Sequence, residues 1–434
     1  MRTYVKGFGC SSNMADTEAL AGCLQNAGHI IVSSPEKAEL VIFNTCAVKT
    51  QTENKMIHLL QKVPREKKLV IAGCLPLVNL RRLHREVRFD GVVGPACGDK
   101  IVDVVRRISM GMNIEEVGEA VNMPRLDLPR MPINSCISII PICYGCLGEC
   151  AYCCVRFARG KLRSYNIEEI TSKVERDLDR GFREFWLTSQ DTACYGKDIG
   201  ASLPELLRRI SGLSGEFLVR VGMMTPDNFL KIKNELIEEF KSGKIFKFLH
   251  IPVQSGDDEI LKRMNRRYSR IDFKAIVGAF KEEFPQSTIA TDVIVGFPGE
   301  TKKAFDNTCE LIEDTRPDIV NISKFFARPK TPEVDLEARI DVQEMKARSA
   351  RMTRLVHNVS FDRNREWGHW SGRILVDEMG KNGSVVGRNF AYKPIAIKID
   401  KVTAKTLIGQ IVEVKVHDVS RSHLLGERVS LLKP

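Results

Sequence analysis

The chain has 434 residues, of which 43% are hydrophobic and 28% are charged. This length suits two or three folded domains, and the composition is that of a globular protein rather than a disordered one. Its 13 cysteines lack the dense spacing of a small secreted scaffold, no apolar run is long enough to span a membrane, and no signal-like segment follows Met1. We therefore expect a cytoplasmic protein with reduced thiols and no membrane contact. The formal net charge of +11 favours a polyanionic partner without identifying it.

Residues 1–125 have the pattern of a small α/β domain. Three short apolar segments predict strands, at residues 4–9, 40–45 and 69–73. An amphipathic segment at residues 16–27 predicts a helix, and this alternation of strands and helices predicts a parallel sheet. Each predicted strand is followed by a cysteine, namely Cys10, Cys46 and Cys74. Because the carboxyl ends of parallel strands share one edge, we expect the three thiols to converge; three separate buried cysteines are the alternative.

A proline-containing linker at residues 122–134 leads into a second series of strands and helices, residues 134–355. Six apolar segments predict strands, at residues 137–143, 182–189, 217–223, 248–253, 288–295 and 318–325. Helical patterns lie between them, for example at residues 167–180 and 301–314. Six such units predict a parallel (βα) barrel, partial or complete.

The most informative feature is the spacing C-x3-C-x2-C of Cys146, Cys150 and Cys153. Three thiolates can hold three irons of a [4Fe-4S] cube and leave the fourth iron open, an arrangement that suits S-adenosylmethionine (SAM). Zinc is the alternative, because Cys143 with Cys146, and Cys150 with Cys153, form two C-x2-C pairs. The loop directly follows the first predicted barrel strand, which favours a catalytic position over a structural zinc site.

Polar side chains mark other strands of the predicted barrel. Gln190, Gln254 and Ser255 fall at strand ends, where they could bind the polar groups of SAM or simply hydrogen-bond within turns. Asp292 lies within a strand and is either a buried structural carboxylate or a group that faces SAM.

The last part of the chain changes character. A basic helix is predicted at residues 344–361, and five short strands in residues 367–434 predict a small β-barrel. From Arg373 onward there are 11 Lys and Arg against 6 Asp and Glu. A basic barrel is a plausible nucleic-acid module, with an ordinary solvated barrel as the alternative.

Together, these parts and their motifs resemble the radical SAM methylthiotransferases over essentially the whole chain. The resemblance is carried by the segments around the six cysteines and by further motifs at residues 187–196, 251–256, 291–301 and 325–332. It implies that Cys146, Cys150 and Cys153 hold a radical SAM cluster, and that a second [4Fe-4S] cluster, which handles sulfur, is held by Cys10, Cys46 and Cys74. It also implies that the barrel is a TRAM-like, RNA-binding domain.

The resemblance is greatest to the archaeal and eukaryotic branch of that family. This implies conversion of the C2–H bond of N6-threonylcarbamoyladenosine at position 37 of tRNA to a methylthio group, with SAM as methyl donor and radical source. Arg328 or Lys330 could anchor the threonylcarbamoyl carboxylate. The reaction also requires an electron donor and a sulfur source, which the sequence does not identify. The alternatives are a methylthiotransferase for isopentenyladenosine or a ribosomal protein, and a non-catalytic, zinc-containing RNA-binding protein.

Overall fold

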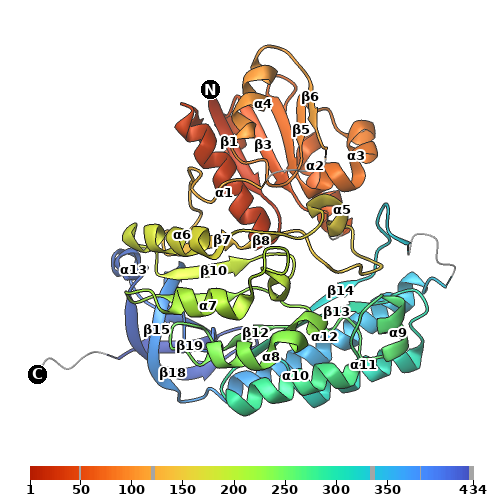
Figure 1. Ribbon diagram of the computed structural model, residues 1–434, viewed down its shortest axis with the longest axis vertical. Helices are drawn as coiled ribbons and strands as arrows, with labels where there is room; N and C mark the ends of the chain where they lie inside the picture. Colours follow the sequence, from red (N-terminus) through yellow and green to blue (C-terminus); the bar gives the residue numbers. More distant parts are fainter. Residues whose placement is uncertain (48–49, 119–122, 333–337, 382, 430–434) are drawn as a thin grey trace, which may run out of the picture.

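The computed structural model describes residues 1–47, 50–118, 123–332, 338–381 and 383–429 (Figure 1). Its N-terminal domain is a parallel six-stranded sheet in the order β2-β1-β3-β4-β5-β6. The strands are β1 (Arg2–Gly7), β2 (Ile30–Ile31), β3 (Leu40–Thr45), β4 (Lys68–Gly73), β5 (Gly91–Val93) and β6 (Ile114–Glu116). The helices are α1 (Ser11–Asn26), α2 (Thr50–Gln61), α3 (Cys74–Glu86) and α4 (Lys100–Ser109).

Burial explains this layering. Every residue of β3 is buried, as expected for a parallel strand that helices cover on both faces. Leu40 and Ile42 pack against α1 and α4, whereas Val41 and Phe43, on the opposite face, pack against α2 and α3. The two-residue alternation of a strand thus sends alternate side chains into two separate cores.

The central domain is a partial barrel of six parallel strands. It consists of two sheets, β11-β10-β7 and β12-β13-β14, which meet between β11 and β12. The strands are β7 (Ile137–Pro141), β10 (Glu184–Thr188), β11 (Leu218–Val221), β12 (Phe248–His250), β13 (Thr288–Val295) and β14 (Ile319–Lys324). A short hairpin, β8 (Cys143–Tyr144) with β9 (Arg163–Ser164), flanks the cysteine loop. All six predicted strands are present, although most are shorter than the apolar runs that predicted them.

Helices follow the strands around the outside of the partial barrel (Figure 1). They are α5 (Val155–Arg159), α6 (Ile167–Asp179), α7 (Leu203–Ser211), α8 (Pro226–Phe240), α9 (Asp258–Arg263), α10 (Arg270–Glu283) and α11 (Lys302–Thr315). Helix α12 (Val342–Arg365) packs beside β14 and α11 and corresponds to the predicted basic helix. Two of its cations are neutralised within the protein, because Arg348 pairs with Glu300 and Arg351 pairs with Asp306.

The C-terminal domain is a closed barrel in the order β15-β16-β17-β19-β18, as predicted. Its strands are β15 (Ser371–Met379), β16 (Ser384–Arg388), β17 (Pro394–Lys398), β18 (Ile411–Val419) and β19 (Leu424–Arg428). The last strand was predicted to extend to residue 431, and residues 430–431 lie outside the described part of the chain. A short helix that the sequence analysis did not predict, α13 (Lys401–Leu407), contributes Ala404 and Leu407 to the barrel core.

Buried charge fastens this barrel to the central domain. Lys393 of the barrel and Arg363 of α12 both contact Asp318, whose side chain is fully buried, at 2.8 and 3.2 Å. Arg220 of β11 stacks against the ring of Tyr392 at 5.2 Å. The barrel is therefore an integral part of the fold rather than a loosely tethered module.

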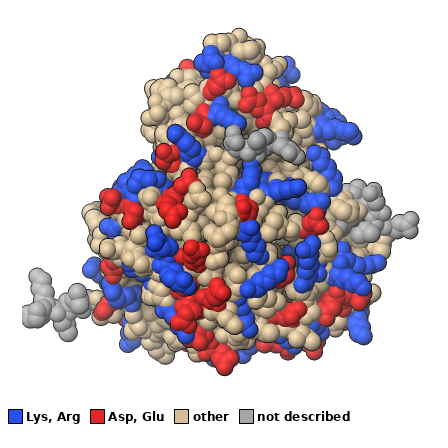
Figure 2. Space-filling model, viewed as in Figure 1, with Lys and Arg blue, Asp and Glu red and all other residues tan. Residues whose placement is uncertain are grey.

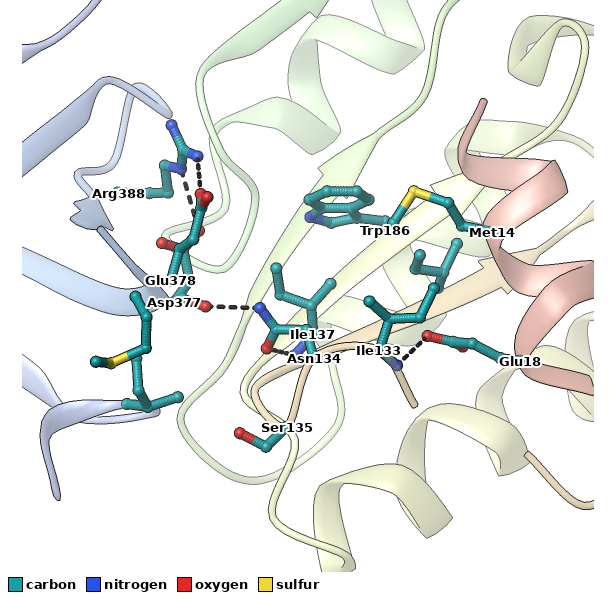
Figure 3. Close-up of a pocket in the computed structure, with 13 residues that line it drawn as sticks. Met14, Glu18, Ile133, Asn134, Ser135, Ile137, Trp186, Asp377, Glu378 and Arg388 are labelled. Carbon is teal, nitrogen blue, oxygen red and sulfur yellow. Dashed lines mark hydrogen bonds and ion pairs between the residues drawn. The ribbon is translucent and has the colours of Figure 1, made fainter. Parts of the chain in front are cut away.

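A cavity of about 500 Å³ lies where α1, the domain linker, β10 and the C-terminal barrel meet (Figure 3). Ile137, Ile139 and Trp186 line it from the outer face of the central sheet, and Glu18 and Asp377 add carboxylates. It opens on the side of these strands rather than at their carboxyl ends. Its acidic lining makes it unsuitable for phosphate, so we assign it no part in RNA binding.

Candidate active site

The N-terminal cysteines lie at one edge of the first sheet. Cys10 precedes α1, Cys46 follows β3, and Cys74 begins α3 directly after β4; strands β1, β3 and β4 are neighbours in the sheet. Gly73 allows the tight turn into α3, because its φ is +99° and a Cβ there would lie 2.3 Å from the carbonyl oxygen of Thr45.

These three thiols form a local group. Burial raises the pKa of Cys74 to about 12, and the charges of Cys10 and Cys46 raise it further, while the charge of Arg159 acts in the opposite direction. Cys10 is exposed and Cys46 is partly exposed, so one side of the triad is accessible. Three converging thiols with an open side fit a cluster that exchanges material with a substrate, and Cys10, Cys46 and Cys74 would hold it.

The second cysteine group follows β8. Cys146, Cys150 and Cys153 are all partly exposed and free. The backbone N–H of Gly148 donates to Cys146 Sγ at 3.1 Å. A Cβ at Gly148 would lie 3.3 Å from Cys146 Sγ and 3.8 Å from Cys150 Sγ, so glycine keeps the space beside both sulfurs clear. The loop therefore fits a cluster, which Cys146, Cys150 and Cys153 would hold.

The zinc alternative requires Cys143 as a fourth ligand. Cys143 is buried in the barrel core and contacts Cys194, which also contacts Cys146. Within the described ranges, no three His, Cys, Asp or Glu side chains are close enough to hold a single metal ion. A cube binds each thiolate through a different iron and so keeps its ligands farther apart than a single ion does. The arrangement thus favours the cluster over zinc.

Arg266 is a residue of this site that sequence reasoning missed. Its Nη1 donates to Cys150 Sγ at 2.9 Å, and its Nε donates to the hydroxyl of Tyr268 at 2.9 Å. Arg266 lies just after α9, far from the cysteine loop in sequence. A charge-assisted hydrogen bond stabilises the thiolate form of Cys150, the form that binds iron. The only signal in the sequence is its place in a basic segment after α9, which does not predict this contact.

Gln190 joins three parts of the molecule. Its Oε1 accepts from the backbone N–H of Gly145 at 2.8 Å, directly before the cysteine loop. Its Nε2 donates to Ser12 Oγ of α1 at 3.4 Å. Gln190 therefore holds the radical-cluster loop against the N-terminal domain, and its predicted contact with SAM remains a prediction.

The other three predicted SAM residues lie together on β12, β13 and the turn after β12. Asp292 Oδ2 lies 2.8 Å from His250 Nε2. Gln254 has a φ of +68°, and its backbone bonds β13 on both sides, through Asp292 and Ile294. Ser255 is fully buried, and its hydroxyl accepts from the backbone N–H of Asp257. These side chains line the strand ends beside the cysteine loop, and their role toward SAM remains a prediction.

The two cations proposed to anchor the modified base have partners in this structure. Arg328 is buried and forms an ion pair with Glu53 of α2, which is also buried. Lys330 is exposed, and its Nζ donates to the carbonyl oxygen of Leu77 at 3.2 Å. Arg328 therefore links the central domain to the N-terminal domain.

Comparisons with known proteins agree with this division of the chain. Residues 140–312 match the Radical SAM superfamily, residues 2–94 match Uncharacterized protein family UPF0004, and residues 372–429 match the TRAM domain. A radical SAM methyltransferase from Kitasatospora setae, TsrM, superposes with a TM-score of 0.56 over 76% of this chain and 75% of its own, at 14% identity. The fold is thus that of a radical SAM protein.

Full-length relatives define the family more closely. A probable threonylcarbamoyladenosine tRNA methylthiotransferase from Pyrococcus horikoshii is 38% identical over 99% of this chain and 100% of its own. One from Archaeoglobus fulgidus is 40% identical, with 98% of each chain covered. The Homo sapiens threonylcarbamoyladenosine tRNA methylthiotransferase is 33% identical over 99% of this chain and 74% of its own. The chain belongs to the threonylcarbamoyladenosine tRNA methylthiotransferase family.

Among the described residues, no helix is both long and apolar enough to cross a membrane.

Proposed function

We propose that this chain is a radical SAM enzyme that methylthiolates N6-threonylcarbamoyladenosine at position 37 of tRNA. In this reaction the C2–H bond of the adenine becomes a C–SCH3 bond. The observation that carries the proposal is the pair of cysteine triads, which lie on two domains that face each other. Helix α5, which begins just after Cys153, packs against α3, which begins with Cys74.

Each triad has its own proposed task. Cys146, Cys150 and Cys153 bind a [4Fe-4S] cluster, and Cys10, Cys46 and Cys74 bind a second cluster that carries the sulfur to be transferred. When bound, the first cluster and SAM supply a carbon radical that can abstract hydrogen from an unreactive C–H bond. Gln190, Gln254, Ser255 and Asp292 position SAM at the strand ends.

A second [4Fe-4S] cluster fits the N-terminal site because its donors are all thiols. The site has three cysteines on adjacent strand ends and, as on the central domain, no fourth cysteine is needed if one iron remains open to a ligand. An external sulfur source and an electron donor complete the reaction. SAM serves as the methyl donor as well as the radical source.

The C-terminal barrel is the proposed tRNA-binding domain. Exposed cations lie on its strands and turns, namely Lys398, Lys405, Lys415, Arg421 and Arg428. On the face shown in Figure 2, lysine and arginine side chains are interspersed with acidic ones over the central and N-terminal domains. We therefore expect phosphate contacts to be made chiefly by the barrel, with residues 1–125, 134–355 and 367–434 acting as three functional domains in the cytoplasm.

The proposal is tested with three tRNA substrates that differ only at position 37: threonylcarbamoyladenosine, isopentenyladenosine and unmodified adenosine. The reconstituted full-length enzyme is incubated anaerobically with SAM, sulfide and dithionite, and the tRNA is digested for nucleoside mass spectrometry. We expect the methylthio product mainly from the first substrate. Equal turnover of the first two, or a preference for isopentenyladenosine, would contradict the assigned substrate while leaving the reaction class intact.

A further inference from the structure

Arg159 places a buried positive charge between the two domains that carry the cysteine triads. It is the last residue of α5, and only 3% of it is exposed. Its Nη2 lies 2.7 Å from Asp16 Oδ2 of α1, and its guanidinium lies 5.5 Å from the centre of the Tyr144 ring. Tyr144 in turn donates its hydroxyl to Asp16 Oδ1 at 3.1 Å. The guanidinium is therefore fixed in orientation by a carboxylate and an aromatic face.

The same guanidinium borders the N-terminal triad. Ala158, its neighbour on α5, packs in one apolar cluster with Cys74 and Ala47, the residue after Cys46. The charge of Arg159 interacts with the thiols of both Cys74 and Cys10. Its Nη1 is buried, and it donates to no oxygen or nitrogen atom within the described part of the chain. The ion pair with Asp16 thus leaves buried donor capacity on the side of the cysteines.

We propose that Arg159 is a positioning residue for the N-terminal cluster, to which it supplies a permanent positive charge and a hydrogen-bond donor from the central domain. The inference rests on the proposed second cluster. Three thiolates on a [4Fe-4S]²⁺ core carry a net negative charge, and a partly buried anion is costly without a nearby cation. Arginine suits this place because its guanidinium stays charged even when it is buried.

Two consequences follow for the cluster. Nearby positive charge and hydrogen bonds to sulfur favour the reduced, more negative state and raise the reduction potential. In addition, a donor that comes from α5 fixes the cluster relative to the loop that carries Cys146, Cys150 and Cys153. Arg159 thereby couples the position of the sulfur-carrying site to the position of the radical site.

The test uses the full chain with Cys146, Cys150 and Cys153 replaced by alanine, so that the remaining iron reports on the N-terminal site alone. In this background we compare Arg159→Met, Arg159→Lys and the matched control Arg156→Met, which removes a partly exposed cation from the same helix. Iron content, the rate of iron loss to a chelator and the reduction potential from an EPR-monitored titration are measured. We expect Arg159→Met to lower the potential and speed iron loss, Arg159→Lys to restore the potential in part, and Arg156→Met to change neither.

A further variant separates this role from simple neutralisation of Asp16. Arg159→Met alone strands the buried Asp16 carboxylate and can destabilise the fold, whereas Arg159→Met with Asp16→Asn removes both charges. We expect the double variant to fold and still show the lowered potential. A wild-type potential in the double variant, or in a folded, iron-loaded Arg159→Met protein, would overturn the role of Arg159 alone. If the background protein with Arg159 intact held no iron, the second cluster and this inference would both fail.

Discussion

Replacing Arg328 by methionine removes one half of the buried ion pair that joins the N-terminal and central domains. Its partner, Glu53, is fully buried, and the carboxylate oxygen Oε2 that faces Arg328 would lose this cation. The other oxygen, Oε1, keeps Arg82 Nη1 and Asn79 Nδ2 as donors, each at 2.9 Å. Breaking a buried pair from one side costs about 3–5 kcal/mol, and the retained donors place our expectation near the lower end, about 3 kcal/mol.

The assay is urea unfolding followed by circular dichroism, together with kcat and KM for tRNA. Lys330→Met is the matched control, because it removes an exposed cation two residues away that contacts only a backbone carbonyl; it should change stability by less than about 0.5 kcal/mol. The double variant Glu53→Gln, Arg328→Met should recover most of the lost stability because no buried charge is stranded. If Arg328→Met were as stable as wild type but raised KM for threonylcarbamoyl-tRNA, Arg328 would instead read the modified base.

Three further predictions concern other parts of the molecule. Arg266→Met should lower the reduction potential of the radical SAM cluster in EPR titrations and slow reductive cleavage of SAM, whereas Arg267→Met, its exposed neighbour, should do neither. Burial, and then Asp377, raise the pKa of Glu184 from 4.5 to about 8. The folded protein resists an ionisation that the unfolded chain undergoes freely, so the penalty grows between those pH values; Glu184→Gln should add on the order of 2 kcal/mol above about pH 9 and nothing below about pH 4, measured by urea unfolding. Neutralising four barrel cations should weaken tRNA binding and reduce its salt dependence by up to about one unit of slope per lost phosphate contact, with unchanged iron content, while the already paired Arg373 serves as the control; the four are Lys398, Lys415, Arg421 and Arg428.

The sequence predicted the parts of the fold that local pattern controls. Strand β3 and strand β13 have the predicted bounds, because β-branched, apolar runs of that length are ended by turn or cysteine segments. Short edge elements were missed: β2, β5 and β6 have only two or three residues each, too few for a periodic signal. The closed barrel was predicted, but its helix α13 interrupts the strand pattern and was not.

The candidate site divides in the same way. The two cysteine triads were found because their spacing and their places at strand ends are local features. Arg266 and Arg159 were not found, since each acquires its role through contacts with residues distant in sequence. The basic helix illustrates the opposite error, in which composition overstated the available charge: Arg348 of α12 is committed to Glu300 inside the protein. Charge composition gives the number of cations but not the carboxylates that they face.

The central claim is that the two triads hold separate clusters with separate tasks. The most direct measurement follows 5′-deoxyadenosine and methylthio nucleoside in the same anaerobic reaction with SAM, sulfide and tRNA, for two triple variants. With Cys10, Cys46 and Cys74 replaced by alanine, we predict about half the wild-type iron, continued release of 5′-deoxyadenosine and no methylthio product. With Cys146, Cys150 and Cys153 replaced, we predict about half the iron and neither product. Methylthio nucleoside from the first variant, or 5′-deoxyadenosine from the second, would contradict the account.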